Sequence, residues 1–252
     1  MLEVQLLGRF SVTCDGRPLA IPARPAQLLL AYLLLNAGAP LPREALADTL
    51  WPDSSAGNAR ANLRHALWQL RAALGDANDP QTAYIVHTAH DIAFNRRSAY
   101  RLDVDTLAHE RPAWTTAALL EAAAAYDGEL LPGFYESWIV PERERLAVLF
   151  NRRASQLLER LMAEERWDET VAWAERWIAL DGAPEPAYRA LMHSYAALGD
   201  AGQVMVAFRR CHEALREQLG IQPSPETRQL AERLTRAVGQ GAAAGAPRDA
   251  GH

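Results

Sequence analysis

The clearest helical pattern in the chain lies between Asp53 and Gly75. Four leucines recur there at intervals of four, three and four residues: Leu63, Leu67, Leu70 and Leu74. This spacing predicts a helix with one buried stripe. Asp53, Ser54 or Ser55 can accept a hydrogen bond from the free N–H groups of the first turn, and Gly75 suits a left-handed end.

A second stripe beside these leucines is cationic and aromatic. It consists of Arg60, Arg64, Trp68 and Arg71. No acidic residue occurs between Ala56 and Gly75. Guanidinium and amide groups recognise base edges and phosphates in a DNA major groove. An isolated basic amphipathic helix is more often an ordinary solvated surface, so the rest of the chain decides between the two interpretations.

The elements around this helix follow the order of a winged helix. Short extended segments are predicted at Leu2–Phe10, Ser11–Cys14 and Arg17–Ile21. Two helices come next, one from about Pro25 to Gly38 and one over Pro42–Trp51. After the helix at 53–75, a hairpin is predicted from Thr82–Thr88 and Asp91–Asn95. We therefore expect an α+β winged helix-turn-helix domain, with a small β-sheet and a C-terminal hairpin, over residues 1–100.

From residue 103 onward the pattern is helical. Helical segments are predicted at about Asp105–His109, Trp114–Tyr126, Ser137–Glu165, Trp167–Leu180, Glu185–Leu198, Ala201–Leu219 and Ser224–Val238. Trp167-Asp168 and Gly199-Asp200 open helices 32 residues apart, close to the tetratricopeptide period of about 34. The sequence predicts an all-α, tetratricopeptide-like (TPR-like) domain over 103–238, with an irregular bundle as the alternative. Small and polar residues predict a disordered tail over 239–252.

Composition agrees with a mainly α protein of two domains. The chain has 252 residues, of which 49% are apolar and 23% charged, as in soluble globular proteins. Its longest apolar run, Leu28–Leu35, is shorter than the roughly 20 residues that span a bilayer. No signal-peptide pattern opens the chain. Cys14 and Cys211 form no CxxC motif, so we expect reduced thiols and a cytoplasmic location.

Charge differs between the two halves. Residues 1–102 contain 10 Arg and 8 Asp or Glu, whereas residues 103–252 contain 16 Arg and 23 Asp or Glu. A locally basic helix on a nearly neutral domain is sufficient for a DNA footprint. The acidic second half is better suited to protein partners.

The sequence does not indicate an enzyme. All 26 basic residues are Arg, and the absence of Lys excludes a Walker-type phosphate loop and Schiff-base chemistry. His87, His90 and Asp91 lack further residues that would complete a tetrahedral metal site. Glu142 and Glu144 have the spacing of surface charges, and no nucleophile motif occurs. We therefore expect no catalytic site, no metal site and no cofactor.

Blocks of sequence spread over nearly the whole chain carry a family resemblance. They are LEVQLLGRFSVTCDGRPL, PREALADTLWPD, NARANLRHALWQLRAALG, LDVDTL, YDGELLPGFYESWIVPERERL, AYRALMHSYAALGD and RRCHEALREQLGIQPSPETRQL. The chain from about Leu2 to Val238 resembles the Streptomyces antibiotic regulatory protein (SARP) family of bacterial transcriptional activators. That family joins a winged helix of the response-regulator output type (OmpR/PhoB-like) to a TPR-like bacterial transcriptional activator domain.

The resemblance implies that the helix at 53–75 is the recognition helix. The implied DNA-facing residues are Arg60, Arg64, His65, Trp68, Gln69 and Arg71, with Arg96 and Arg97 after the hairpin as further candidates. Arg71 belongs to the family's usual Leu-Arg pair, whereas Trp68 and Gln69 stand where relatives often carry Arg or Ser. Relatives have a Gly-rich hairpin turn, but this chain has HTAHD. Asp91 would repel a phosphate, so we expect this turn to lie away from the minor groove.

The resemblance further implies a sequence-specific activator that binds promoter direct repeats as head-to-tail pairs. Its expected partners are double-stranded promoter DNA, RNA polymerase and a second protomer, at least on DNA; no membrane is expected. An alternative is a TPR-like protein-interaction scaffold whose winged helix no longer reads DNA, with Trp68 as a protein contact. A third interpretation is the N-terminal part of a longer regulator, because relatives often append an ATPase and further repeats.

Overall fold

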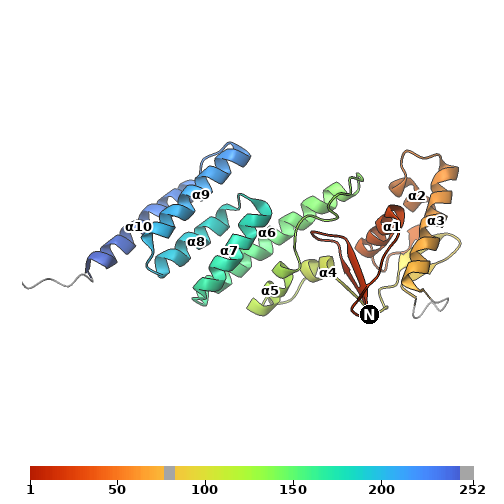
Figure 1. The fold of residues 1–252 in the computed structure, drawn as a ribbon, viewed down its shortest axis with the longest axis horizontal. Helices are drawn as coiled ribbons and strands as arrows, with labels where there is room; N and C mark the ends of the chain where they lie inside the picture. The colour runs from red at the N-terminus through yellow and green to blue at the C-terminus, as the bar shows by residue number, and fades with distance from the viewer. Residues whose placement is uncertain (77–82, 245–252) are drawn as a thin grey trace, which may run out of the picture. The chain divides into compact units, whose positions relative to one another are not determined.

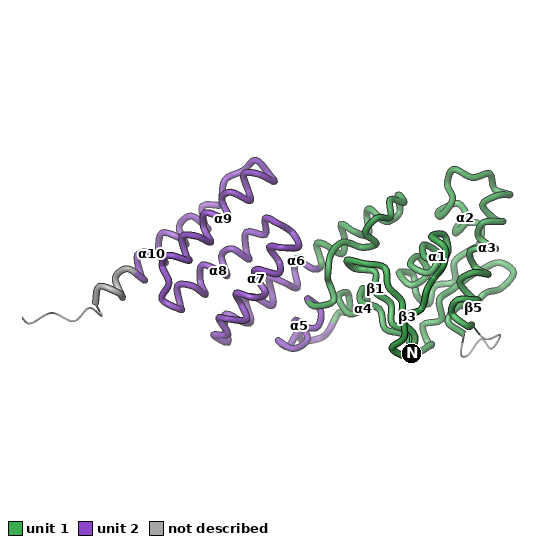
Figure 2. Tube along the Cα trace, viewed as in Figure 1, with its two compact units in different colours: residues 1–110, 124–149 green, residues 111–123, 150–252 purple. Residues whose placement is uncertain are grey.

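The computed structural model describes residues 1–76 and 83–244, with side chains up to residue 238, and is mostly helical (Figure 1). The chain divides into two compact units, residues 1–110 with 124–149, and residues 111–123 with 150–252 (Figure 2). The division falls within helix α6, Ile139–Ala163. This division reflects the contacts within each unit. The expected domain limits, 1–100 and 103–238, remain a prediction.

A sheet in the first unit is built around β1, Leu2–Gln5. Its strand order is β3-β2-β1-β7, with β2 at Ser11–Cys14, β3 at Arg17–Pro18 and β7 at Tyr100–Leu102. Strand β1 is antiparallel to β2 and parallel to β7. Strand β7 was not predicted, because three residues are too few to show an alternating pattern.

Strand β1 is shorter than predicted because the following backbone binds Asp103. The expected strand Leu2–Phe10 ends at Gln5. The amides of Leu6 and Leu7 each donate to Oδ2 of Asp103 at 2.8 Å. These amides therefore satisfy their hydrogen bonds outside the sheet ladder.

The predicted helices of the first unit are present as α1 (Arg24–Leu35), α2 (Arg43–Leu50) and α3 (Ala56–Leu74). Helix α1 is buried on most of its surface and has Pro25 in its first turn, where the missing N–H costs little. Helix α3 packs against both α1 and α2. The apolar helix α1 thus forms the centre on which α3 rests. Helix α4, Asp103–Ala108, follows β7 directly.

A separate sheet contains the predicted hairpin and one unexpected strand. Its order is β4-β6-β5, with β4 at Leu41–Pro42, β5 at Ile85–His87 and β6 at Asp91–Phe94, all antiparallel. The sequence placed Pro42 inside a helix, but it precedes α2 with φ −59° and ψ 133°. Proline is compatible with an edge strand and with the position before a helix. Thr82, the first residue of the predicted hairpin, lies outside the described residues.

The second unit is an array of packed helices. Its elements are α5 (Thr116–Ala124, all but its last residue), the later part of α6, α7 (Trp167–Asp181), α8 (Glu185–Ala197), α9 (Ala201–Leu219) and α10 (Pro225–Ala244). Helices α7 to α10 lie side by side, each packed against the next (Figure 1). This is the stacking that a TPR-like arrangement requires.

Helix α10 is longer than predicted. It continues past Val238 to Ala244. The last three residues of the helix are alanines, and alanine has the highest helix propensity. Residues 239–244 of the expected disordered tail are therefore helical. Residues 245–252 lie outside the described residues.

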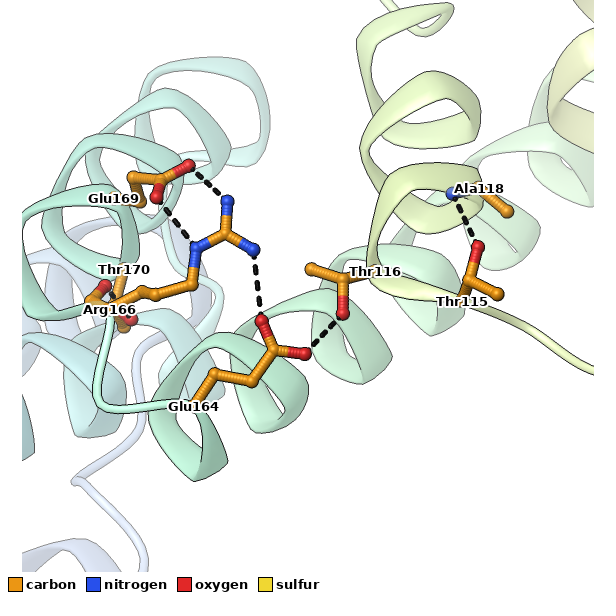
Figure 3. Close-up of polar contacts among 7 residues, drawn as sticks. All are labelled: Thr115, Thr116, Ala118, Glu164, Arg166, Glu169 and Thr170. Carbon is orange, nitrogen blue, oxygen red and sulfur yellow. Dashed lines mark hydrogen bonds and ion pairs between the residues drawn. The ribbon is translucent and has the colours of Figure 1, made fainter.

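Arg166 closes the turn between α6 and α7 (Figure 3). Its guanidinium donates to Glu164 and Glu169, and Glu164 also accepts from the hydroxyl of Thr116 on α5. The bonds from Thr116 and Arg166 lower the pKa of Glu164, and the bonds from Arg166 lower that of Glu169. Both carboxylates are thus stabilised as anions, so this cluster connects helix ends and offers no acid–base pair.

The carboxylate of Asp103, which accepts from the backbone amides after β1, has a pKa that can be tested. Burial raises this pKa from 3.8 to about 6, although the backbone amides of Leu6, Leu7 and Val104 donate to the carboxylate. Because the folded-state pKa is raised, the stabilisation from this group is complete below pH 3.8 and is lost as the pH rises through 6. Carbon-13 NMR of the Asp103 carboxyl should show a midpoint near pH 6. A midpoint near pH 4 would contradict the predicted burial effect.

Candidate nucleic-acid interface

Helix α3 begins and ends as its sequence predicts. The hydroxyl oxygen of Ser55 accepts a hydrogen bond from the amide of Asn58 at 3.5 Å. At the other end, Gly75 has φ 62° and the amide of Asp76 donates to the carbonyl of Arg71 at 3.1 Å. This left-handed ending favours glycine. The length of the helix is therefore set by its own capping residues.

The leucine stripe of α3 is buried and determines how the helix is rotated. Leu63, Leu67, Leu70 and Leu74 have exposed fractions of 2%, 6%, 0% and 8%. Ala59 and Ala66 are also buried, and their small side chains allow close packing. Burial of this face against α1 and α2 leaves the neighbouring face outside.

The predicted cationic stripe lies on that outer face. Arg60 and Arg64 are exposed, Arg71 is half-buried, and the indole of Trp68 is 65% exposed. Intervals of four, four and three residues align these side chains along a helix with about 3.6 residues per turn. Because α3 contains no acidic residue, this face presents positive charge and one large aromatic ring.

His65 joins this stripe, but Gln69 does not. The imidazole of His65 stacks on the indole of Trp68, with ring centroids 5.9 Å apart and planes inclined by 24°. Gln69 is half-buried and lies about 100° around the helix from Trp68. Gln69 is thus displaced from the Arg60–Arg71 stripe, although it lies only about 40° around the helix from His65.

His87 of the hairpin contacts the recognition face directly. Nη1 of Arg71 lies 2.9 Å from Nε2 of His87. Arginine cannot accept a hydrogen bond, so Nε2 of His87 is the acceptor and Nδ1 carries the proton. From the sequence, His87 was considered only as a metal ligand, and that interpretation was rejected. A contact between residues 16 positions apart has no signal in a local sequence pattern.

A hollow of about 380 Å³ lies where the helix meets the hairpin. It is lined by Arg64, Leu67, Trp68, Arg71, Ala72, Asp76 and His87. Asp76 does not direct a free carboxylate into this hollow, because its two oxygens accept from the amides of Tyr84 at 2.6 Å and Ile85 at 2.8 Å. The arrangement therefore concentrates cationic donors around a space that suits an anionic group.

The hairpin turn is fixed to the start of α2. The hydroxyl of Thr88 accepts from the amides of His90 and Asp91 at 3.1 and 2.9 Å. Nε of Arg43 donates to the carbonyl of Thr88 at 3.1 Å. The backbone amide of Arg43 donates to the carbonyl of His90 at 2.8 Å. Arg43 was not among the predicted site residues, yet it adds a positive charge close to His87.

Arg96 and Arg97 lie at the end of the hairpin that is remote from its turn. Both are exposed and, with Ala37 and Gly38, border a different hollow of about 1000 Å³. The amide of Gly38 donates to the carbonyl of Phe94 at 3.1 Å, which ties this end to α1. The structure thus places these two arginines apart from the Arg71–His87 contact, and their role in DNA binding remains a prediction.

Over residues 1–76 and 83–244, no three His, Cys, Asp or Glu side chains are grouped so that they could hold a metal ion. Within the same ranges, no helix is both long and apolar enough to cross a membrane.

Comparisons with known proteins identify a family and similar regulators. The family described as bacterial transcriptional activator domain matches residues 91–235. The chain is similar to the transcriptional regulatory protein EmbR of Mycobacterium bovis, with 27% identity over 261 residues, covering 93% of this chain and 63% of the relative. It is also similar to the transcriptional regulatory protein MoaR1 of Mycobacterium bovis, with 24% identity over 253 residues, covering 93% and 79%. The chain thus spans less than two thirds of the length of EmbR.

A solved structure shares the fold. It is Mycobacterium tuberculosis EmbR in complex with a low-affinity phosphopeptide, with a TM-score of 0.72, 22% identity, and coverage of 96% of this chain and 69% of that chain. At this identity the likeness concerns the fold alone. It confirms the predicted fold class, mainly α with a winged helix and a helical domain.

The Arg71–His87 contact predicts a lowered imidazole pKa. Burial lowers the pKa of His87 from 6.5, and the charges of Arg71 and Arg43 lower it further. The imidazole is therefore neutral at pH 7, and the contact weakens when the pH falls through the folded-state pKa. NMR titration should give a midpoint below 6.5 for His87, and Arg71→Ala should raise it. The control Arg60→Ala should not change it; a midpoint above 6.5 would contradict the contact.

Proposed function

The chain belongs to the family of proteins with a bacterial transcriptional activator domain, and from this premise we propose that it is a transcriptional regulator that binds duplex promoter DNA through α3. The observation that carries this proposal is the outer face of α3, where Arg60, Arg64, Trp68 and Arg71 are aligned without any acidic residue. A helix of this kind can enter the major groove with its side chains against base edges.

The residues of this face have distinct proposed roles. Arg64 and Arg71 border the same hollow. The guanidinium of exposed Arg64 can donate two parallel hydrogen bonds to a guanine edge or to a phosphate, and Arg71 adds positive charge beside it. Neutral His87 accepts from Arg71, so it holds the guanidinium in place without removing its charge. We assign discrimination between bases to Arg64 and His65, with Gln69 reading a neighbouring position.

The part of the chain from residue 103 onward has the composition of a protein-binding domain. Residues 103–252 contain 23 acidic residues against 16 Arg, which disfavours binding to DNA phosphates. Stacked helices such as α7 to α10 provide extended surfaces for protein partners. We propose that this C-terminal part contacts RNA polymerase, a second protomer on tandem direct repeats, or both, and that the regulator acts as an activator.

A second candidate function is a protein-interaction scaffold. The observation that favours it is Trp68, since a tryptophan with 65% exposure is a frequent anchor of protein interfaces. In that case binding to promoter fragments would show no sequence preference and almost no dependence on salt.

Substitution of the two arginines tests the proposal. Arg64→Ala and Arg71→Ala should each weaken binding of the full chain to its selected DNA site by about 5-fold to 150-fold, which corresponds to about 1–3 kcal/mol for one lost bidentate contact. Loss of a base contact should relax the preference at one base pair. Loss of a phosphate contact should instead weaken binding to all sequences and reduce the salt slope by about 1. Fluorescence anisotropy at several salt concentrations distinguishes the two cases.

Arg209→Ala is the matched control, because Arg209 is exposed on α9 and its loss changes the net charge equally. Its affinity for DNA should be close to that of the unmodified protein. Unchanged affinity of both α3 variants at moderate salt, with intact circular dichroism, would overturn DNA binding through α3.

A further inference from the structure

Trp68 is exposed and yet held in a defined position. Its indole is 65% exposed, which is unusual for the largest apolar side chain of a helix. Stacking against His65, with ring planes inclined by 24°, restricts the rotation of the ring. The ring also borders the hollow at the junction of helix and hairpin. A large apolar surface that is already ordered costs little conformational entropy on binding.

The neighbours of Trp68 indicate the chemistry of its partner. Arg64 lies four residues before it and Arg71 three residues after it, so each is about one helical turn away. A partner that covers the indole must therefore supply negative charge on both sides and an apolar group between. DNA offers this combination, because phosphates line the major groove and the C5 methyl of thymine is the apolar group on its floor.

The indole offers a base one N–H donor and one large apolar face. Its single polar group is an N–H donor, so it cannot accept from the amino groups of adenine or cytosine. Its flat face can make dispersion contacts with a methyl group and exclude water from it. A contact of this kind distinguishes thymine from cytosine at one position of a site.

We propose that Trp68 is a specificity-determining residue that recognises the C5 methyl group of a thymine in the major groove. This proposal rests on the proposed function, because it requires α3 to lie against base edges. It assigns to Trp68 a preference that the arginines cannot supply, since guanidinium groups select guanine and phosphate.

The test replaces single thymidines of the DNA by deoxyuridine. This removes the C5 methyl group of the base and leaves base pairing unchanged. The DNA is the site enriched from random duplexes by the full chain, with each thymine replaced in turn. At one or more positions the unmodified protein should bind deoxyuridine about threefold to fivefold more weakly, the effect of one lost methyl contact. Trp68→Ala should bind the thymine and deoxyuridine duplexes equally.

Two variants separate this effect from a general loss of affinity. Trp68→Phe keeps an apolar ring and should retain part of the preference, whereas the control Arg209→Ala on α9 should retain all of it. Equal binding of thymine and deoxyuridine duplexes by the unmodified protein, while Arg64→Ala still weakens binding, would overturn the role of Trp68 and leave the proposed function intact. Failure to enrich any site would overturn both. Unchanged site preference in Trp68→Ala would also overturn the role.

Discussion

The first unit depends on the burial of one face of α3. The leucines of this face are almost completely inaccessible and pack against α1 and α2, so their removal from water is the main stabilising contribution at this junction. A helix fixed along one stripe cannot rotate. The same burial therefore decides that Arg60, Arg64 and Trp68 face outwards. Stability and the presentation of the binding face are thus two consequences of one packing interaction.

The hairpin adds a second constraint to this face. Asp76 joins the end of α3 to β5 through backbone amides, and Arg43 joins the hairpin turn to α2. Between these anchors, His87 accepts from Arg71. The imidazole is kept neutral by burial and by the neighbouring guanidinium groups. The contact with neutral His87 therefore leaves the charge of Arg71 unchanged and helps to fix the orientation of its guanidinium.

Much of the fold could be predicted, because long amphipathic helices have a strong periodic signal. The limits of α3 follow from Ser55 and Gly75, and the family resemblance is confirmed by the match over residues 91–235. Strands β4 and β7 were missed, since two or three residues show no period. The Arg71–His87 contact joins two elements and could not be read from spacing. The orientation of Gln69 away from Arg71 could have been derived from helical geometry alone. The DNA-facing residues themselves remain predictions.

The measurement that tests the account most directly is selection of genomic fragments by the purified full chain at two salt concentrations. If the outer face of α3 reads DNA, a short direct repeat upstream of promoters should be enriched, and binding to it should weaken steeply with salt, because each neutralised phosphate contributes a slope of about −0.9. Uniform binding to all fragments, with little dependence on salt, would contradict the account.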